Sequence, residues 1–308
     1  MSNSSNSTPE QSRTTPAQDV LVIGGGMAGL AGALALRENG ASVTLVENAP
    51  AFGEVGAGLQ MAPNASRVLK RWGLLEKALE IGVQPKHLVF RDAVSGEELT
   101  RQSLGAEFEE RYGAPYVVIH RSDLHRILLE ACQENGVTLL NGVFVEKVET
   151  EGDKARAYAA NGDVYEANAV LAADGLKSTL RKAVAEDAPV PSSYVAYRGT
   201  VPITDATPKA DLEDVIVYLG PNCHLVQYPL RKGELLNTVA VFKSASFERG
   251  EEQYGGVRLG GADIIKAFHL RSVPRADQDA YANSSTICSR SAIGSRSLAT
   301  FRHFNFCQ

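Results

Sequence analysis

Three glycines and one glutamate have the types and spacing of a nucleotide-binding turn. Gly24, Gly26 and Gly29 follow a short apolar run and open a helical pattern. Gly24 permits a tight turn, Gly26 lets the backbone approach a pyrophosphate, and Gly29 lets helix and strand pack closely. Glu47 ends the next apolar run, where its carboxylate can accept hydrogen bonds from ribose hydroxyls. The pattern predicts a dinucleotide site, against the alternative of a structural glycine turn, and does not separate NAD from FAD.

The same turn predicts which backbone groups hold the phosphates. Met27 and Ala28 complete the first helical turn between Gly26 and Gly29. A helix N-terminus offers unbonded N–H groups and the positive end of the helix dipole to an anion. These two residues are therefore predicted to contribute to the cofactor site through their backbone.

A second group of residues that could do chemistry lies in the stretch CHLVQYPL, residues 223–230. Alternation along a strand places His224, Val226 and Tyr228 on one face. Arg198, in YVAYRGT, can join them from another strand. From the residues alone, a single histidine on a strand is more often a core or surface residue, and a tyrosine is more often packing.

An acid and a glycine follow the apolar residues 169–173 in VLAADGLKSTLR. If this run is the strand beside the first one, Asp174 and Gly175 lie at its carboxyl end, where open α/β sheets hold their ligands. Ser178 and Arg181 can fix the loop that follows. The alternative is a helix start, with Asp174 as N-cap and Arg181 in solvent.

The elements that would position these residues predict an α/β fold with a parallel sheet. Residues 19–47 form one predicted β-α-β unit, which implies a parallel sheet. A helix is predicted over 122–136, then three antiparallel strands with a tight turn at Asn161-Gly162, and then the returning buried strand 169–173. Hairpins are predicted within 87–104 and 223–244, and single strands within 193–203 and 214–220.

The order of these elements predicts an α/β fold made of two interleaved domains. A Rossmann-like domain, with a parallel sheet and a three-stranded β-meander, is expected from residues 19–84 and 115–185. A mixed β-sheet substrate domain is expected from residues 85–114 and 186–256. Residues 1–18, rich in Ser, Thr, Pro and Gln, are expected to be a disordered tail. Residues 257–308 have little apolar periodicity and are atypical.

Composition excludes several classes of function. The 308 residues are 44% hydrophobic and 22% charged, as in a globular protein, and the net charge of −5 gives no basic footprint for nucleic acid. No apolar run approaches the ~20 residues that span a bilayer. The four cysteines are scattered, which predicts neither a metal site nor a disulfide framework, and favours the cytoplasm.

Together the motifs resemble those of the class A flavoprotein monooxygenases, the aromatic hydroxylases. The resemblance rests on the glycine turn with Glu47, on HRSDLHRIL (residues 120–128) and on DGLKSTLR (residues 174–181), and it extends over about residues 19–256. It implies FAD as cofactor and NADH as co-substrate. It also implies that Arg121, Gln60 and the Asp174-Gly175 pair contact FAD, whereas His120 and His125 are expected to be structural.

Longer stretches resemble the members of this family that hydroxylate 3-hydroxybenzoate, among them GEVGAGLQ and YGAPYVVIHRSDLH. The resemblance implies that O2 and reduced flavin form an electrophilic C4a-hydroperoxide, which a phenolate attacks. His224 is then the base, since imidazole titrates near neutral pH, whereas a phenol titrates near 10. Tyr228 would orient the substrate, and Arg198 would contact substrate or nicotinamide. The product would be 2,5-dihydroxybenzoate.

One further motif of the family, a later Gly-Asp stretch that contacts FAD, is not found in the sequence. A truncated or frame-shifted chain after about Gly256 is therefore one expectation, and an inactive FAD-binding remnant is one alternative function. A salicylate-type or hydroxynicotinate-type hydroxylase is another. A different Rossmann flavoenzyme is disfavoured by the second and third motifs. A homodimer is a possible assembly.

Overall fold

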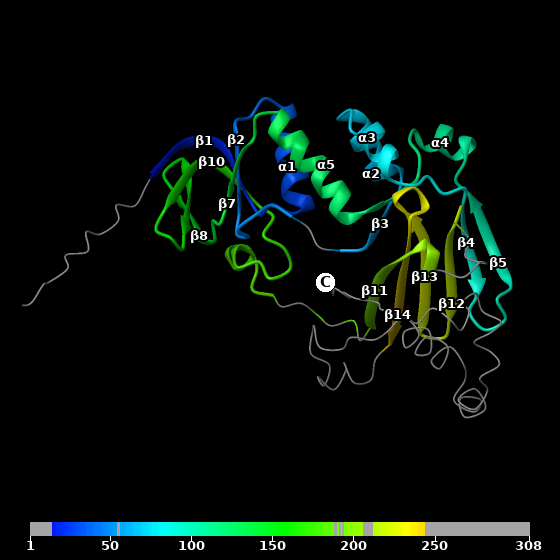
Figure 1. Cartoon of the computed structure of the whole chain (residues 1–308). Coiled ribbons are helices and arrows are strands. Elements are labelled where there is room, and N and C mark those ends of the chain that lie inside the picture. Colours follow the sequence, from blue (N-terminus) through cyan, green and yellow to red (C-terminus); the bar gives the residue numbers. More distant parts are fainter. Residues whose placement is uncertain are drawn as a thin grey trace, which may run out of the picture. The chain divides into compact units, whose positions relative to one another are not determined.

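The computed structural model describes residues 14–53, 56–187, 190, 192, 194–205 and 212–243 (Figure 1). These residues form two compact units. The first unit holds the described residues before position 55 and those from 125 to 187, and the second holds the described residues from 56 to 124 and from 190 to 243. The atypical stretch 257–308 and residues 1–13 lie outside the described residues.

The first unit contains a six-stranded sheet in the order β7-β2-β1-β10-β9-β8. Strands β7, β2, β1 and β10 are parallel neighbours, and β10, β9 and β8 are antiparallel. This confirms the predicted Rossmann-like sheet with its three-stranded β-meander. Its elements are β1 (Thr14–Ile23), α1 (Met27–Glu38), β2 (Val43–Glu47), α5 (Arg121–Glu134), which begins in the second unit, β7 (Thr138–Asn141), β8 (Val145–Glu151), β9 (Lys154–Ala159), β10 (Val164–Ala172) and the 3-10 turn η1 (Leu180–Ala183).

Helices α1 and α5 run side by side (Figure 1), and both contribute apolar side chains to the core. Leu30 and Ala33 of α1 are fully buried, and α1 packs on β1 and β2. On α5 the apolar stripe includes Ile127 and Ala131, each only 1% exposed. Apolar residues at this helical spacing account for the position of both helices in the unit.

Strand β10 is one continuous strand that serves both parts of the sheet. Its first half pairs with β9 as far as Ala167, and it pairs with β1 as far as Ala172. The prediction that residues 169–173 form a buried strand beside the first one is therefore half right. The pairing is confirmed, but Ala169 and Ala172 are exposed, because β9 ends its pairing at Ala167 and no other described strand continues along that edge.

The second unit contains a six-stranded mixed sheet in the order β11-β14-β13-β12-β4-β5, and a two-stranded sheet of β3 and β6. Only β12 and β4 pair in parallel; the other neighbours are antiparallel. Its elements are β3 (Gly58–Met61), α2 (Pro63–Arg71), α3 (Leu75–Ile81), β4 (His87–Asp92), β5 (Glu98–Ser103), α4 (Ala106–Tyr112), β6 (Val117–His120), β11 (Tyr194–Pro202), η2 (Ile203–Asp205), β12 (Val215–Gly220), β13 (Cys223–Leu230), η3 (Arg231–Gly233) and β14 (Leu235–Lys243).

The alternation predicted along residues 223–230 is confirmed by the packing of β13. Tyr228 packs in a cluster with Val118 of β6, whereas Cys223 and Leu225 pack in a different cluster with Phe242. Both predicted hairpins of this unit, β4–β5 and β13–β14, are present. The sheet therefore has one face toward β6 and another with its own apolar cluster.

One boundary differs from expectation. Strand β1 begins at Thr14, so residues 14–18 of the expected tail are described as strand. The two compact units place residues 55–84 and 115–124 with the mixed sheet, but such a division says nothing of which ligand each part binds, and the predicted domains stay a prediction. No helix among the described residues is long and apolar enough to cross a membrane.

Candidate functional site

The turn between β1 and α1 admits no side chain at two of its glycines. Gly24 has φ +106°, and a Cβ built there would lie 2.3 Å from the carbonyl oxygen of Ala173. A Cβ built at Gly29 would lie 1.8 Å from the carbonyl oxygen of Gly24. The backbones of β1, α1 and the end of β10 therefore meet at contact distance, which only glycine allows.

Gly25 is the residue of this turn that side chains hold in place. Its N–H donates to the Glu47 carboxylate at 2.5 Å, and the other oxygen of Glu47 accepts from the N–H of Ala49 at 2.7 Å. A Cβ at Gly25 would lie 2.7 Å from the ring of Phe52. Glu47 thus supports the turn itself, and a carboxylate has enough lone pairs to accept from ribose hydroxyls as well.

The start of α1 is built to receive an anion. Gly26 is the N-cap and offers no side chain, and the first intrahelical bond runs from the N–H of Leu30 to the carbonyl of Gly26 at 3.0 Å. No hydrogen bond joins the amides of Gly26, Met27, Ala28 or Gly29 to another residue that the structure describes. These four N–H groups have no acceptor among the described residues, and they fit the pyrophosphate of FAD. The Glu47 carboxylate beside them fits a ribose.

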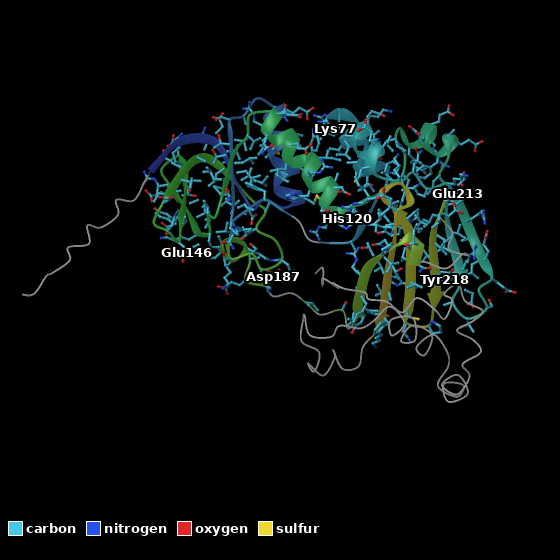
Figure 2. All side chains as sticks on the ribbon, viewed as in Figure 1. Lys77, His120, Glu146, Asp187, Glu213 and Tyr218 are labelled. Carbon is cyan, nitrogen blue, oxygen red and sulfur yellow. The ribbon has the colours of Figure 1, made fainter. Side chains whose placement is uncertain are left out.

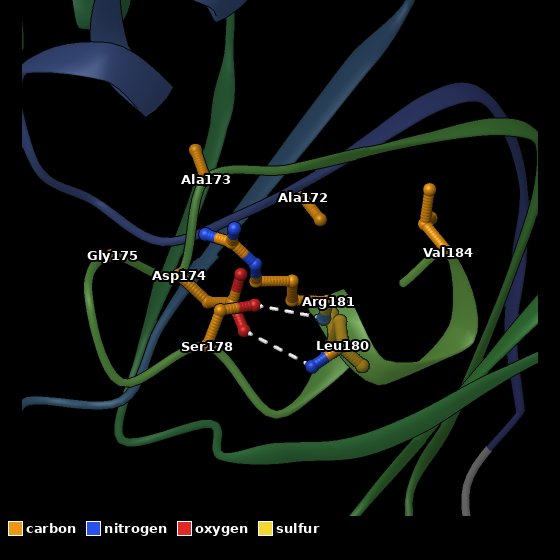
Figure 3. A pocket seen from close by; sticks show the side chains of 8 residues that line it. All are labelled: Ala172, Ala173, Asp174, Gly175, Ser178, Leu180, Arg181 and Val184. Carbon is orange, nitrogen blue, oxygen red and sulfur yellow. Dashed lines mark hydrogen bonds between the residues drawn. The ribbon is translucent and has the colours of Figure 1, made fainter. Parts of the chain in front are cut away.

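Asp174 and Gly175 are brought beside this turn, because β10 runs parallel to β1. A Cβ at Gly24 would lie 3.1 Å from the backbone nitrogen of Asp174. Asp174 and Gly175 also line a pocket of about 310 Å³, together with Ser178, Leu180 and Arg181 (Figure 3). The prediction that Asp174 lies at the carboxyl end of the strand beside the first one is confirmed, because β10 ends at Ala172 beside β1.

The loop after Asp174 is held by its own side chains. The Asp174 carboxylate accepts a long hydrogen bond of 3.4 Å from the N–H of Leu180, and the Ser178 hydroxyl accepts from the N–H of Arg181 at 2.9 Å (Figure 3). The Arg181 side chain is 58% exposed, and its guanidinium pairs with Asp187, which is labelled in Figure 2. Asp174 therefore supports the turn weakly and keeps lone pairs for a ligand.

Two other residues predicted to contact FAD belong to the second unit. Gln60 lies on β3, is exposed, and accepts a hydrogen bond from the Tyr116 hydroxyl at 2.8 Å. Arg121 begins α5; its N–H donates to Ala57, and its side chain packs over Gly56, where a Cβ would lie 2.8 Å from the arginine Cδ. Both residues thus stand on the paired strands β3 and β6 or immediately after them.

The register of the mixed sheet places the three residues with predicted chemical roles on one face. Val239 of β14 pairs with Arg198 on one side and with Val226 on the other. Directly paired residues of antiparallel strands point to the same face. Val226 shares its face with His224 and Tyr228, so Arg198, His224 and Tyr228 lie on the same face of the sheet.

Gly58 is the point where this face meets β3. A Cβ at Gly58 would lie 2.5 Å from the ring of Tyr228. The N–H of Gly58 donates to the side-chain oxygen of Asn237 at 2.8 Å, and its carbonyl accepts from Arg198 at 3.3 Å. Three strands of the mixed sheet thus hold one residue of β3.

Burial sets the protonation of the two candidate groups on β13. Desolvation lowers the pKa of His224 from the usual value of 6.5, so the neutral imidazole persists to lower pH. Burial raises the pKa of Tyr228, which the nearby Arg198 charge only partly opposes, so the phenol stays protonated. His224 is therefore suited to accept a proton and Tyr228 to donate a hydrogen bond.

Replacing Gly58 with alanine is expected to destabilise the chain by about 1–3 kcal/mol, because the new methyl group overlaps the Tyr228 ring. Urea unfolding measures the change. Gly53→Ala is the matched control, since a Cβ at Gly53 meets nothing within 4 Å. In the Tyr228→Leu background the Gly58→Ala substitution should cost clearly less, and an undiminished cost would contradict the contact.

Two residues hold these arrangements in ways the sequence did not predict: Asn237 was not singled out, and His125 was expected only to be structural. Asn237 is fully buried, and its side-chain nitrogen has no partner among the described residues. His125, 3% exposed, donates from Nε2 to the carbonyl of Gly25 at 2.8 Å. The sequence feature that could have pointed to each of them is a polar residue within an apolar stretch, which for His125 is the apolar stripe of α5.

Residues 17–243 match the FAD-binding domain family. The chain is 39% identical over 260 residues to 3-hydroxybenzoate 6-hydroxylase of Polaromonas naphthalenivorans, covering 84% of this chain and 64% of that protein. It is 33% identical over 210 residues to 6-hydroxynicotinate 3-monooxygenase of Bordetella bronchiseptica, covering 68% of this chain and 54% of that protein.

Solved structures show the same fold. HpxO of Klebsiella pneumoniae with FAD and uric acid is similar with a TM-score of 0.66 at 22% identity, covering 86% of this chain and 64% of that one. CtdE with FAD and its substrate has a TM-score of 0.69 at 19% identity, covering 85% of this chain and 65% of that one. The chain spans 64% of the length of each of two 3-hydroxybenzoate 6-hydroxylases that it matches.

Proposed function

Because the chain belongs to the FAD-binding domain family, we propose that it is an FAD-dependent monooxygenase that uses NADH and O2 to hydroxylate a phenolic acid. The observation that carries the proposal is the common face of His224, Tyr228 and Arg198 on the mixed sheet. A base, a hydrogen-bond donor and a fixed cation on one face suit a substrate with a phenol and a carboxylate.

The first unit supplies most of the proposed cofactor contacts. The amides of Gly26 to Gly29 would bind the pyrophosphate, and Glu47 would accept from a ribose. Asp174 with Gly175 would contact the ribityl hydroxyls, and Arg121 and Gln60 are also proposed to contact FAD. When bound, FAD supplies the redox chemistry that takes electrons from NADH and activates O2.

The residues of the sheet face would handle the substrate. His224 would take the phenol proton, because the phenolate pushes charge into the ring at the position that is hydroxylated. Tyr228, kept protonated by burial, would donate a hydrogen bond that orients the substrate. Arg198 would bind the substrate carboxylate through its positive charge, or the nicotinamide by donating a hydrogen bond to its carboxamide oxygen.

We propose 3-hydroxybenzoate as substrate and 2,5-dihydroxybenzoate as product, with the new hydroxyl para to the old one. The similarity to 3-hydroxybenzoate 6-hydroxylases of two organisms at 39% and 34% identity supports this choice. The similarity to 6-hydroxynicotinate 3-monooxygenase supports a second candidate, a hydroxylated pyridine carboxylate.

The purified chain tests the proposal in two steps. The absorption spectrum is expected to show two flavin bands, one visible and one near-ultraviolet, either on purification or after FAD is added. NADH consumption should then rise with 3-hydroxybenzoate more than with salicylate or 6-hydroxynicotinate, and product analysis should show 2,5-dihydroxybenzoate. A colourless chain that takes up no FAD would overturn the proposal and favour an inactive remnant. Greater stimulation by 6-hydroxynicotinate would select the second candidate.

Three related proposals accompany this function. Residues 19–84 and 115–185 would bind FAD, and residues 85–114 and 186–256 would bind the substrate. The cytoplasm is the proposed location, because the four cysteines are scattered and suggest no disulfide framework. A homodimer is the proposed assembly.

A further inference from the structure

We propose that His125 is a positioning residue for the cofactor, because it fixes the peptide group that presents the Gly26 amide to the FAD pyrophosphate. The ring Nε2 of His125 lies 2.8 Å from the carbonyl oxygen of Gly25. A carbonyl only accepts, so Nε2 carries the proton and donates. The inference rests on FAD as cofactor, but its test does not depend on FAD alone.

Because a peptide group is planar, this contact also fixes the direction of the Gly26 N–H. A trans peptide is planar, so the carbonyl of Gly25 and the N–H of Gly26 point in opposite directions. With the carbonyl held toward α5, the Gly26 N–H points away from α5. That amide is one of the four at the start of α1 with no acceptor among the described residues.

Gly25 is held on both sides of its α-carbon. Its N–H donates to Glu47 of β2, and its carbonyl accepts from His125 of α5. Glycine is free to rotate about both backbone bonds, so an unsupported turn of this kind would adopt many conformations. Two side chains from separate elements reduce that freedom before the ligand arrives, which lowers the entropy lost on binding.

Packing alone does not account for a histidine at this position. His125 is 3% exposed and lies in the stripe of α5 that also contains Leu124, Leu128 and Cys132. A buried polar group costs free energy unless it is hydrogen-bonded, and an apolar residue would fill the space without that requirement. The hydrogen bond from this ring to the Gly25 carbonyl is therefore what offsets the cost of burying the histidine.

Three variants of α5 test the proposal. His125→Leu removes the donor, and His125→Gln keeps an N–H donor at similar reach. Cys132→Ala is the matched control, because Cys132 is also buried on α5 and also bonds a backbone carbonyl, that of Leu30 at 3.4 Å, beyond the turn. The measurements are FAD affinity by fluorescence titration of the apo chain, and hydrogen–deuterium exchange of residues 22–29 without FAD.

For His125→Leu we expect FAD affinity to fall on the order of tenfold and exchange at the turn to accelerate, since a buried carbonyl loses its donor. His125→Gln should restore most of both, and Cys132→Ala should change neither. Unchanged exchange and affinity in His125→Leu, or an equal effect of Cys132→Ala, would overturn the proposal. If the wild-type chain takes up no FAD, the proposed function fails, but the exchange measurement still decides the role of His125.

Discussion

Replacing His224 with alanine is expected to lower the turnover of 3-hydroxybenzoate by about 10²–10⁴-fold while FAD affinity stays unchanged. The half-buried imidazole stands on the same sheet face as Tyr228 and Arg198, and desolvation keeps it neutral and able to accept a proton. Without it the substrate must react as the neutral phenol at neutral pH. Product formation, measured beside flavin absorbance, separates catalysis from cofactor binding.

The pH dependence gives this prediction a second, independent signature. The folded-state pKa of His224 is lowered from 6.5, so the base form is lost only as pH falls through that lowered value. Wild-type activity should therefore decline on the acid side below the usual imidazole range. The deficit of His224→Ala should shrink as pH rises toward ~10, because the phenol of the substrate then ionises unaided.

A histidine elsewhere in the same sheet provides the control. His87 of β4 pairs with Asp214 through its ring nitrogen at 2.9 Å, and it has no part in the proposed chemistry. His87→Ala should keep FAD affinity and turnover, whatever it does to stability. Unchanged turnover in His224→Ala, or a deficit that persists at high pH, would remove His224 as the base.

Local patterns made much of the fold predictable. The β-α-β unit around Gly24 was predicted because apolar periodicity, glycine spacing and the Asn39-Gly40 end of α1 all stand within thirty residues of one another. The hairpins β4–β5 and β13–β14 were predicted because the two strands of each hairpin are also close together in the sequence. The continuity of β10 was not, because a strand that lies between β9 and β1 as far as Ala167 and pairs only with β1 beyond it has two patterns of burial along its length.

Long-range contacts explain what the sequence could not predict at the site. The bond between Gly58 and Asn237 joins residues 179 positions apart, and the bond between Gly25 and His125 joins residues 100 positions apart. No spacing rule connects such pairs. The strands β3 and β6 are only four residues each, too short for an alternation of apolar and polar residues to predict them. The residue types of the site were predictable, whereas the groups that hold them were not.

The turn proposed to bind FAD should not tolerate even one methyl group at Gly29. A Cβ there would lie 1.8 Å from the carbonyl oxygen of Gly24 and 3.0 Å from its carbonyl carbon, and these are backbone atoms that cannot rotate away. Gly29→Ala must therefore separate α1 from the end of β1. We expect FAD affinity to fall by at least about 100-fold, because the amides at the start of α1 lose their common direction.

Gly32, one turn further along α1, is the matched control for this substitution. A Cβ at Gly32 would meet only the side-chain end of Leu171, at 2.5 Å, and that side chain can move. Alanine is favoured over glycine within a helix by about 1 kcal/mol, so Gly32→Ala should keep or raise stability and keep FAD affinity. Equal loss in both variants would show that α1 responds to any added methyl group. Retained affinity in Gly29→Ala would show that the close contact of helix and strand is not needed to hold the cofactor.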